Sequence, residues 1–150
     1  KWMLSNVLKK EYIKLNVECK DWEEAIRKTG EILVEKELVT EEYIEETIRG
    51  VRELGPYIVV TKGVAMPHST NSIGVNKNGV SLLTLKEPIK FGSKENDPVY
   101  NIFIITTTDI ESHLTALSSL SDLLKKQEFF DVIKNANNPE TIINYIKANE

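Results

Sequence analysis

The hydrophobic period of this chain changes twice, from helical to extended near residue 57 and back to helical near residue 109. In the first part, apolar residues recur every three or four positions behind the predicted N-caps Asp21 and Thr40, as they do on one face of a helix. Gly55-Pro56 predicts the end of the second helix, because proline cannot continue a helix and glycine suits the position after it.

The middle of the chain has the pattern of strands. Short runs of β-branched and other apolar residues, without helical spacing, indicate buried strands. We predict strands at residues 57–60, 80–85 and 98–105, and shorter strands at 64–66 and 73–75.

Helical spacing returns in the last third. Leucines from Leu114 to Leu124 form one stripe, residues 129–133 suggest a short helix, and Asn138-Pro139 predicts the start of a last helix. Apolar helix stripes need a surface to cover, and strands that are apolar on both sides need helices on both sides. The sequence therefore predicts an α/β protein, a three-layer α/β/α sandwich whose mixed central sheet has helices on both faces.

Length and composition narrow the classes of function. We expect residues 1–150 to form a single domain of a standalone chain, with Lys1 and Trp2 a remnant ahead of Met3. The net charge of −4 argues against a nucleic-acid binder, which needs a basic patch. The one cysteine, Cys19, cannot form an internal disulfide, which favours a reducing cytoplasm. No apolar run approaches the roughly 20 residues of a spanning helix.

His68 lies where a short apolar run ends in Pro67-His68. Gly63 permits unusual backbone angles and Pro67 fixes its own φ, so the imidazole is expected just beyond a strand end. Ser69 and Thr70 follow and offer hydroxyl and backbone donors to an anion. These residues indicate either a nucleophilic histidine that forms a phosphate adduct or a surface-loop histidine without a role, and composition alone favours the second.

His113 lies at the expected start of the leucine-striped helix. Free N–H groups and the macrodipole favour anions there, and a ring N–H in the first turn can point at a phosphoryl group. The nearby Asp109 and Glu111 can orient an imidazole or repel a phosphate. A solvent-facing histidine is the alternative.

Other chemistries find less support. Two histidines without a third ligand at metal spacing make a poor zinc site, so we expect neither a metal nor a cofactor. Ser69 beside His68 raises the idea of a hydrolase, but a nucleophile elbow is missing. A hydrolase or metal protein that uses His68 and His113 stays as a third hypothesis.

At His68 the sequence resembles a known family. The segment Gly63–His68 resembles the Gly-Val/Ile-Ala-x-Pro-His motif of the mannitol/fructose-type enzyme IIA domains of bacterial sugar phosphotransferase systems. Gly55–Val60 is similar to the ascorbate-type branch of that family, as is Phe91 followed by Asn96–Val99. Ser112-His113, which leads into a helix, matches the family's second histidine. The resemblance covers nearly the whole chain.

The resemblance implies a cytoplasmic phosphotransferase component of sugar transport with a phosphohistidine intermediate. His68 would accept a phosphoryl group on Nε2 from the phosphohistidine of HPr and pass it to a cysteine of enzyme IIB, which serves the membrane enzyme IIC. His113 would stabilise the phosphoryl group and Ser69 would help to bind it. The carbohydrate would be ascorbate or a related polyol or pentose, and oligomeric state stays open.

Several expectations refine this hypothesis. The attacking nitrogen is free only if a partner holds the proton on the other one, and a loop carbonyl is expected to do so. An apolar collar is expected around the site for partner proteins. Family members more often have Gly or Ala where Ser69 stands, and Arg49 and Arg52 cannot be aligned securely with the arginine that some members place near the site. The alternative is an enzyme IIA-like regulatory domain of a phosphotransferase-controlled transcriptional regulator.

Overall fold

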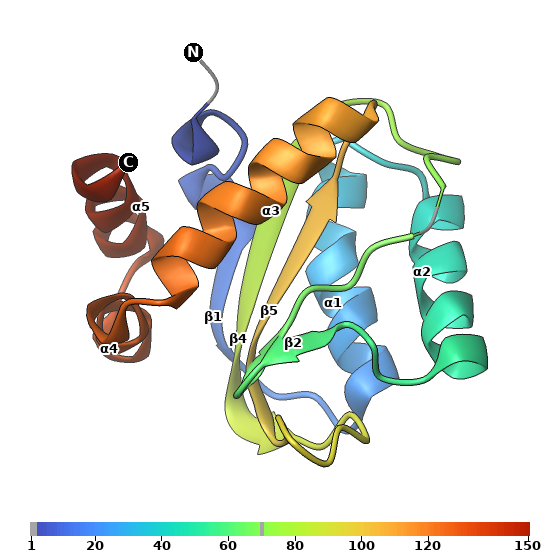
Figure 1. Ribbon diagram of the computed structural model, residues 1–150, viewed down its shortest axis with the longest axis horizontal. Coiled ribbons are helices and arrows are strands. Elements are labelled where there is room, and N and C mark those ends of the chain that lie inside the picture. Colours follow the sequence, from blue (N-terminus) through green and yellow to red (C-terminus); the bar gives the residue numbers. More distant parts are fainter. Residues whose placement is uncertain (1–2, 70) are drawn as a thin grey trace.

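The computed structural model describes residues 3–69 and 71–150 and contains a five-stranded mixed sheet (Figure 1). Lys1, Trp2 and Thr70 lie outside the described residues, and so do the predictions that Lys1 and Trp2 are a remnant and that Thr70 offers donors to an anion. The strand order is β1-β4-β5-β3-β2. Only β1 with β4 and β3 with β5 are parallel neighbours. The strands are β1 (Ile13–Val17), β2 (Val59–Thr61), β3 (Val64–Ala65), β4 (Gly79–Ile89) and β5 (Val99–Thr106).

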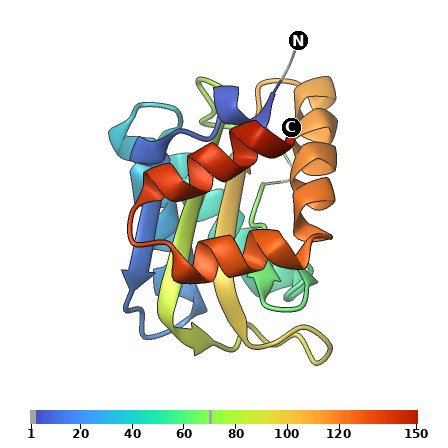
Figure 2. The same ribbon diagram turned by 90° about the vertical axis from the view of Figure 1, so that its left-hand side faces the viewer.

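Helices cover both faces of this sheet. One face carries α1 (Trp22–Glu35) and α2 (Glu41–Leu54). The opposite face carries α3 (Ile110–Leu124), α4 (Gln127–Asn135) and α5 (Pro139–Asn149), as Figure 2 shows. Two short 3-10 helices, Leu4–Asn6 and Lys10–Tyr12, precede β1. The predicted three-layer architecture is therefore confirmed.

Alternation along the central strands explains the two layers of helices. On β5, Phe103 and Ile105 pack with α3, α4 and α5, whereas Ile102 and Ile104 pack with α1 and α2. All four are almost completely buried. Successive side chains of a strand point to opposite faces, so a strand that is apolar at every position needs cover on both sides.

Several boundaries differ from the predictions. The predicted strand at 57–60 begins later, at Val59, because Tyr57 and Ile58 belong to a turn in which the Val59 N–H bonds to the Pro56 carbonyl at 3.1 Å. The predicted strand at 73–75 is wrong: Gly74 has φ +84° in a turn, and only Val75 makes an isolated bridge.

The N-terminal strand β1 was missed. Its sequence, Ile-Lys-Leu-Asn-Val, mixes apolar and polar residues, and it is short. The strands expected at 80–85 and 98–105 are present as β4, which is longer, and β5, which is shifted by one residue.

Two of the three predicted caps are confirmed. The side chains of Asp21 and Asn138 accept hydrogen bonds from backbone N–H groups three residues on. Asp109 caps α3 in the same way, which was not predicted from the sequence. Thr40 occupies its predicted position but makes no side-chain capping bond. Gly55 ends α2 with φ +88°, a conformation that glycine adopts without strain. Within residues 3–69 and 71–150, no helix is both long enough and apolar enough to cross a membrane.

Candidate functional site

The two histidines meet at one edge of the sheet. Strands β3 and β5 are parallel neighbours, so their carboxyl ends lie at the same edge. His68 follows β3 after Met66-Pro67, and His113 lies in the first turn of α3, which follows β5. Their ring centroids are 5.4 Å apart. The fold thus brings together the two residues that the sequence singled out.

A backbone carbonyl orients the ring of His68. The Nδ1 atom lies 2.8 Å from the carbonyl oxygen of Met66. A carbonyl oxygen can only accept a hydrogen bond, so this contact requires the proton on Nδ1 and leaves the Nε2 lone pair free. The Met66 N–H in turn bonds to the Ile58 carbonyl at 2.8 Å, which ties the orienting peptide to the turn before β2.

Two tyrosines that the sequence did not single out also contact this loop. The Tyr57 ring meets the His68 ring edge-on, with centroids 5.9 Å apart, and its hydroxyl donates to the His68 carbonyl at 3.3 Å. The Tyr43 hydroxyl accepts from the Ser69 N–H at 3.2 Å and donates to the Ile105 carbonyl at 3.0 Å. Burial raises the pKa of Tyr43, so its hydroxyl stays protonated and keeps both bonds. Tyr43 therefore joins the loop after His68 to the end of β5.

An open pocket of about 380 Å³ surrounds the histidines. Ser69 lines it, with its backbone N–H engaged by Tyr43 and its Oγ accepting from the Asn71 N–H at 3.3 Å. Within residues 3–69 and 71–150 the Ser69 hydroxyl accepts a hydrogen bond but donates none, so its proton can point into the pocket. The lining residues are Tyr43, His68, Ser69, Asn71, Ser72, Thr107, Asp109, Ile110 and His113.

The start of α3 is less available to an anion than the sequence suggested. The Asp109 carboxylate accepts from the Ser112 N–H at 2.7 Å and from the Ser112 hydroxyl at 3.0 Å. The bond from the Ser112 N–H is the main reason that the pKa of Asp109 is lowered. The first turn is therefore capped by a carboxylate of the chain itself, which places a negative charge at the edge of the pocket.

His113 has a lowered pKa. Its partial burial, and then the neighbouring His68, lower its pKa below the ordinary value of 6.5. A neutral imidazole predominates at pH 7, and it carries one N–H donor and one acceptor nitrogen.

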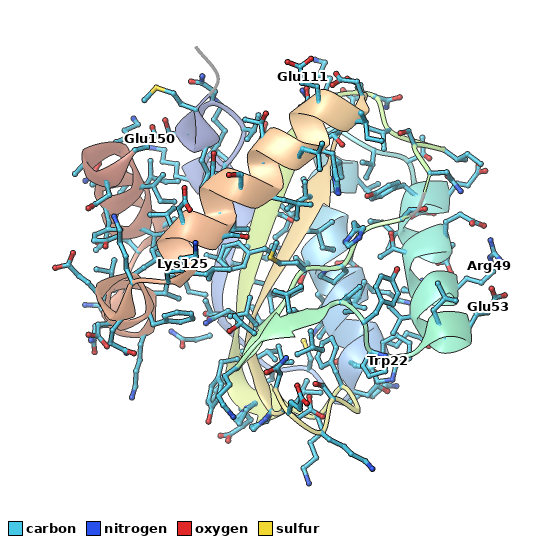
Figure 3. All side chains as sticks on the ribbon, viewed as in Figure 1. Trp22, Arg49, Glu53, Glu111, Lys125 and Glu150 are labelled. Carbon is cyan, nitrogen blue, oxygen red and sulfur yellow. The ribbon has the colours of Figure 1, made fainter. Side chains whose placement is uncertain are left out.

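The two arginines that the sequence left open do not line the pocket. Arg49 pairs with Glu46 at 2.5 Å and with Glu53 at 3.1 Å, and Figure 3 shows Arg49 and Glu53 on the outer side of α2, away from α3. Arg52 pairs with Glu23 of α1. Among the described residues, no group of three or more His, Cys, Asp or Glu side chains could hold a metal ion.

Comparison with known proteins agrees with this geometry. Residues 6–149 match the family "Phosphoenolpyruvate-dependent sugar phosphotransferase system, EIIA 2". The chain is 32% identical over 135 residues to the ascorbate-specific PTS system EIIA component of Escherichia coli K12, covering 89% of this chain and 88% of that protein.

Solved structures show the same similarity. The mannitol-specific cryptic phosphotransferase enzyme IIA CmtB of Escherichia coli is 30% identical, with a TM-score of 0.85 over 98% of this chain and 99% of that one. A second similar structure is the complex of enzyme IIAMtl and phosphorylated enzyme IIBMtl from Escherichia coli. The matched chain of that complex is 25% identical to this one, with a TM-score of 0.82 over 95% of this chain and 99% of that one. The chain therefore belongs to the EIIA 2 family of phosphoenolpyruvate-dependent sugar phosphotransferase systems.

Proposed function

We propose that this chain is the phosphoryl carrier of a sugar phosphotransferase system of the ascorbate branch, and that His68 carries the phosphoryl group. The observation that carries this proposal is the 2.8 Å contact between His68 Nδ1 and the Met66 carbonyl, which leaves Nε2 as the free nucleophile. Family membership supports the reaction class. The similarity to ascorbate-specific components supports the branch.

In the first transfer, the Nε2 lone pair of His68 attacks the phosphorus of the phosphohistidine of HPr. The N–P bond of the donor breaks, and its electron pair returns to the donor imidazole. The new phosphoimidazole of His68 keeps the Nδ1 proton and gains positive charge in its ring. The Met66 carbonyl dipole stabilises that charge, since it accepts the Nδ1–H bond throughout.

In the second transfer, the thiolate of an enzyme IIB cysteine attacks the same phosphorus. The Nε2–P bond breaks, its electron pair returns to His68, and the imidazole regains its starting tautomer. A relative is known in complex with a phosphorylated enzyme IIB, which supports this partner. Enzyme IIB would then supply the membrane enzyme IIC, with this chain in the cytoplasm acting as one domain.

The other residues of the pocket would position the phosphoryl oxygens. His113, neutral because its pKa is lowered, donates its ring N–H without competing as a second cation. The hydroxyl of Ser69, which lines the pocket, would be a further donor. Three exposed apolar side chains would form the collar for partner proteins: Tyr57, whose ring meets His68, Ile110, which lines the pocket, and Leu114, which follows His113.

The test is phosphorylation of the chain from phosphoenolpyruvate by enzyme I and HPr, followed by intact-mass spectrometry. We expect a gain of one acid-labile phosphate in the parent and none in His68→Ala. The His113→Gln variant is expected to be phosphorylated more slowly, by about tenfold to a hundredfold. Uptake by folded His68→Ala would refute the site, and no uptake by the parent would refute the carrier.

Transfer onward separates the remaining alternatives. Incubation of the phosphorylated chain with an ascorbate-type enzyme IIB and, in parallel, a mannitol-type one is expected to dephosphorylate it at least about tenfold faster with the first. Equal rates would contradict the ascorbate assignment. A chain that is phosphorylated but delivers to neither would fit the regulatory-domain hypothesis instead.

A further inference from the structure

A second and larger pocket lies at the other end of the sheet from the histidines. It has a volume of about 480 Å³, within the range of roughly 300–1,000 Å³ that is usual for small-molecule sites. Asn101 lines it near the start of β5, whereas the histidine site follows the end of that strand at Thr106. Five residues of strand separate the two by about 17 Å. The lining residues are Asn16, Lys62, Gly63, Thr84, Leu85, Lys86, Tyr100, Asn101, Phe130, Ile133 and Lys134.

The floor of this pocket is polar where the neighbouring sheet positions are apolar. Thr84 and Asn101 are register partners on β4 and β5, on the face that α4 covers. The next pair on the same face, Leu82 and Phe103, belongs to the apolar core. The two polar side chains are 7% and 9% exposed, and burial of a polar group is costly unless it finds a hydrogen-bond partner.

The side chain of Asn101 has no hydrogen-bond partner among the described residues, although it is more than nine-tenths buried. Thr84, by contrast, accepts from the Asn16 N–H at 2.8 Å. The Asn101 amide offers two donor hydrogens and one acceptor oxygen toward the pocket that it lines. The amide is not sealed from solvent: among the described residues, only the Tyr145 hydroxyl is a fully buried side-chain polar atom without a partner. The Asn101 amide therefore reaches the pocket, where its donors and acceptor are available to a ligand that carries hydroxyl groups.

The rim of the pocket is cationic. Lys62 in the turn between β2 and β3, Lys86 on β4 and Lys134 on α4 line it, and no carboxylate is among the described residues that line it. Lys86 pairs with the exposed Glu18 at 3.2 Å. Exposed ion pairs are weak, so an anion bound in the pocket can take the place of Glu18. The chain as a whole has a net charge of −4, so this concentration of lysines does not follow from composition. Ammonium groups bind phosphate as point charges.

Two aromatic residues complete the walls. Tyr100 and Phe130 line the pocket together with Leu85 and Ile133, and such surfaces pack against the C–H face of a sugar ring. We propose that this pocket binds a phosphorylated sugar, with the phosphate on the lysines and the hydroxyl groups on Asn101. The site is separate from His68, so the proposal stands whether or not His68 carries a phosphoryl group.

The experiment is a titration of the full chain, labelled with ¹⁵N, with fructose 6-phosphate, followed by amide chemical shifts. We expect saturable shifts centred on Asn101, Thr84 and Lys86, with a Kd on the order of 1 mM. Fructose alone and inorganic phosphate alone are each expected to bind at least about tenfold more weakly, since each satisfies only one half of the site.

Variants decide whether the named residues make the site. Asn101→Leu, which keeps the volume of the side chain, and the double variant Lys86→Gln/Lys134→Gln are each expected to raise the Kd by about tenfold or more. Lys125→Gln, an exposed lysine outside this pocket, is the matched control and should leave the Kd unchanged. Retained spectral dispersion shows that each variant is folded.

Three results would overturn the proposal. The first is the absence of saturable shifts at about 20 mM fructose 6-phosphate, roughly twentyfold above the expected Kd. The second is shifts centred on His68 and His113 instead of Asn101. The third is an unchanged Kd in both folded pocket variants, which would place the binding elsewhere.

Discussion

Removal of the Tyr43 hydroxyl tests whether one buried side chain holds the His68 loop against the sheet. Tyr43→Phe keeps the ring in the core and deletes two hydrogen bonds, one to the Ile105 carbonyl and one from the Ser69 N–H. The bond to Ile105 is buried, so its loss leaves the Ile105 carbonyl without the Tyr43 hydroxyl as donor, and this costs about 1–2 kcal/mol of stability. The bond from Ser69 is partly buried, and water replaces part of it, so it adds about 0.5–1 kcal/mol.

The sum predicts that Tyr43→Phe lowers the free energy of unfolding by about 2 kcal/mol. For a chain of this length, that corresponds to a fall in Tm of roughly 4–8 °C. Urea unfolding followed by far-UV circular dichroism measures the change, with an unchanged m-value as evidence that the folded and unfolded states are comparable.

The same variant should slow phosphorylation of His68 at a temperature where both proteins are folded. The Ser69 backbone is no longer fixed, so the adjacent imidazole samples more positions, and we expect a loss of about tenfold in the rate of transfer from HPr. Tyr57→Phe is the matched control for stability: its hydroxyl bond to His68 is long and exposed, and its loss should cost less than about 0.5 kcal/mol.

The reasoning would be refuted if Tyr43→Phe unfolded within about 0.5 kcal/mol of the parent. An equal loss in Tyr43→Phe and Tyr57→Phe would refute it too, because the structure makes burial the difference between the two hydroxyls.

Two further predictions concern pH and a turn. His113 has a lowered pKa when folded, so its contribution to stability is complete above its ordinary pKa of about 6.5 and is lost as the pH falls through the lower, folded value. The stability of the parent minus that of His113→Gln, from urea midpoints, should therefore fall between pH 7.5 and pH 5, and a constant difference would contradict this. Gly74→Ala should destabilise by about 1–3 kcal/mol in urea unfolding, because φ is +84° and the new Cβ would lie 2.5 Å from Thr40 Oγ1. Gly55→Ala, with φ +88° and no atom within 4 Å of its Cβ, separates the cost of the backbone angle and should lose less, about 1 kcal/mol.

The parts of the fold that the sequence predicted correctly are those that local chemistry decides. Asp21 and Asn138 each cap a helix because a short polar side chain can reach an N–H three residues on, whatever the rest of the chain does. The α/β class and the helices on both faces were also confirmed, since runs such as Ile102–Ile105 are apolar at every position.

The errors fall where distant contacts decide. Strand β1 mixes polar and apolar residues and is identified only by its pairing with β4. Ile73–Val75 has strand-like composition, but the segment forms a turn at Gly74 that packs closely against Thr40 and Tyr43, and it does not pair with a neighbouring strand along its length. Tyr43 repeats with the apolar face of α2, and nothing in that period reveals that its hydroxyl reaches Ile105 in another element.

The sequence by itself determined the family and the fold class and singled out the two histidines as candidates, because the Pro67-His68 segment, the second histidine and the hydrophobic periods are all local. Only the tertiary structure decided the geometry of the site. The parallel pairing of β3 with β5 brings the ring centroids of His68 and His113 to 5.4 Å, and the turn at Met66 places its carbonyl against Nδ1 of His68. The tertiary structure also gathers three lysines and Asn101 around a second pocket. Such arrangements depend on which strands become neighbours, and that is set by the packing of the whole core rather than by any segment of it.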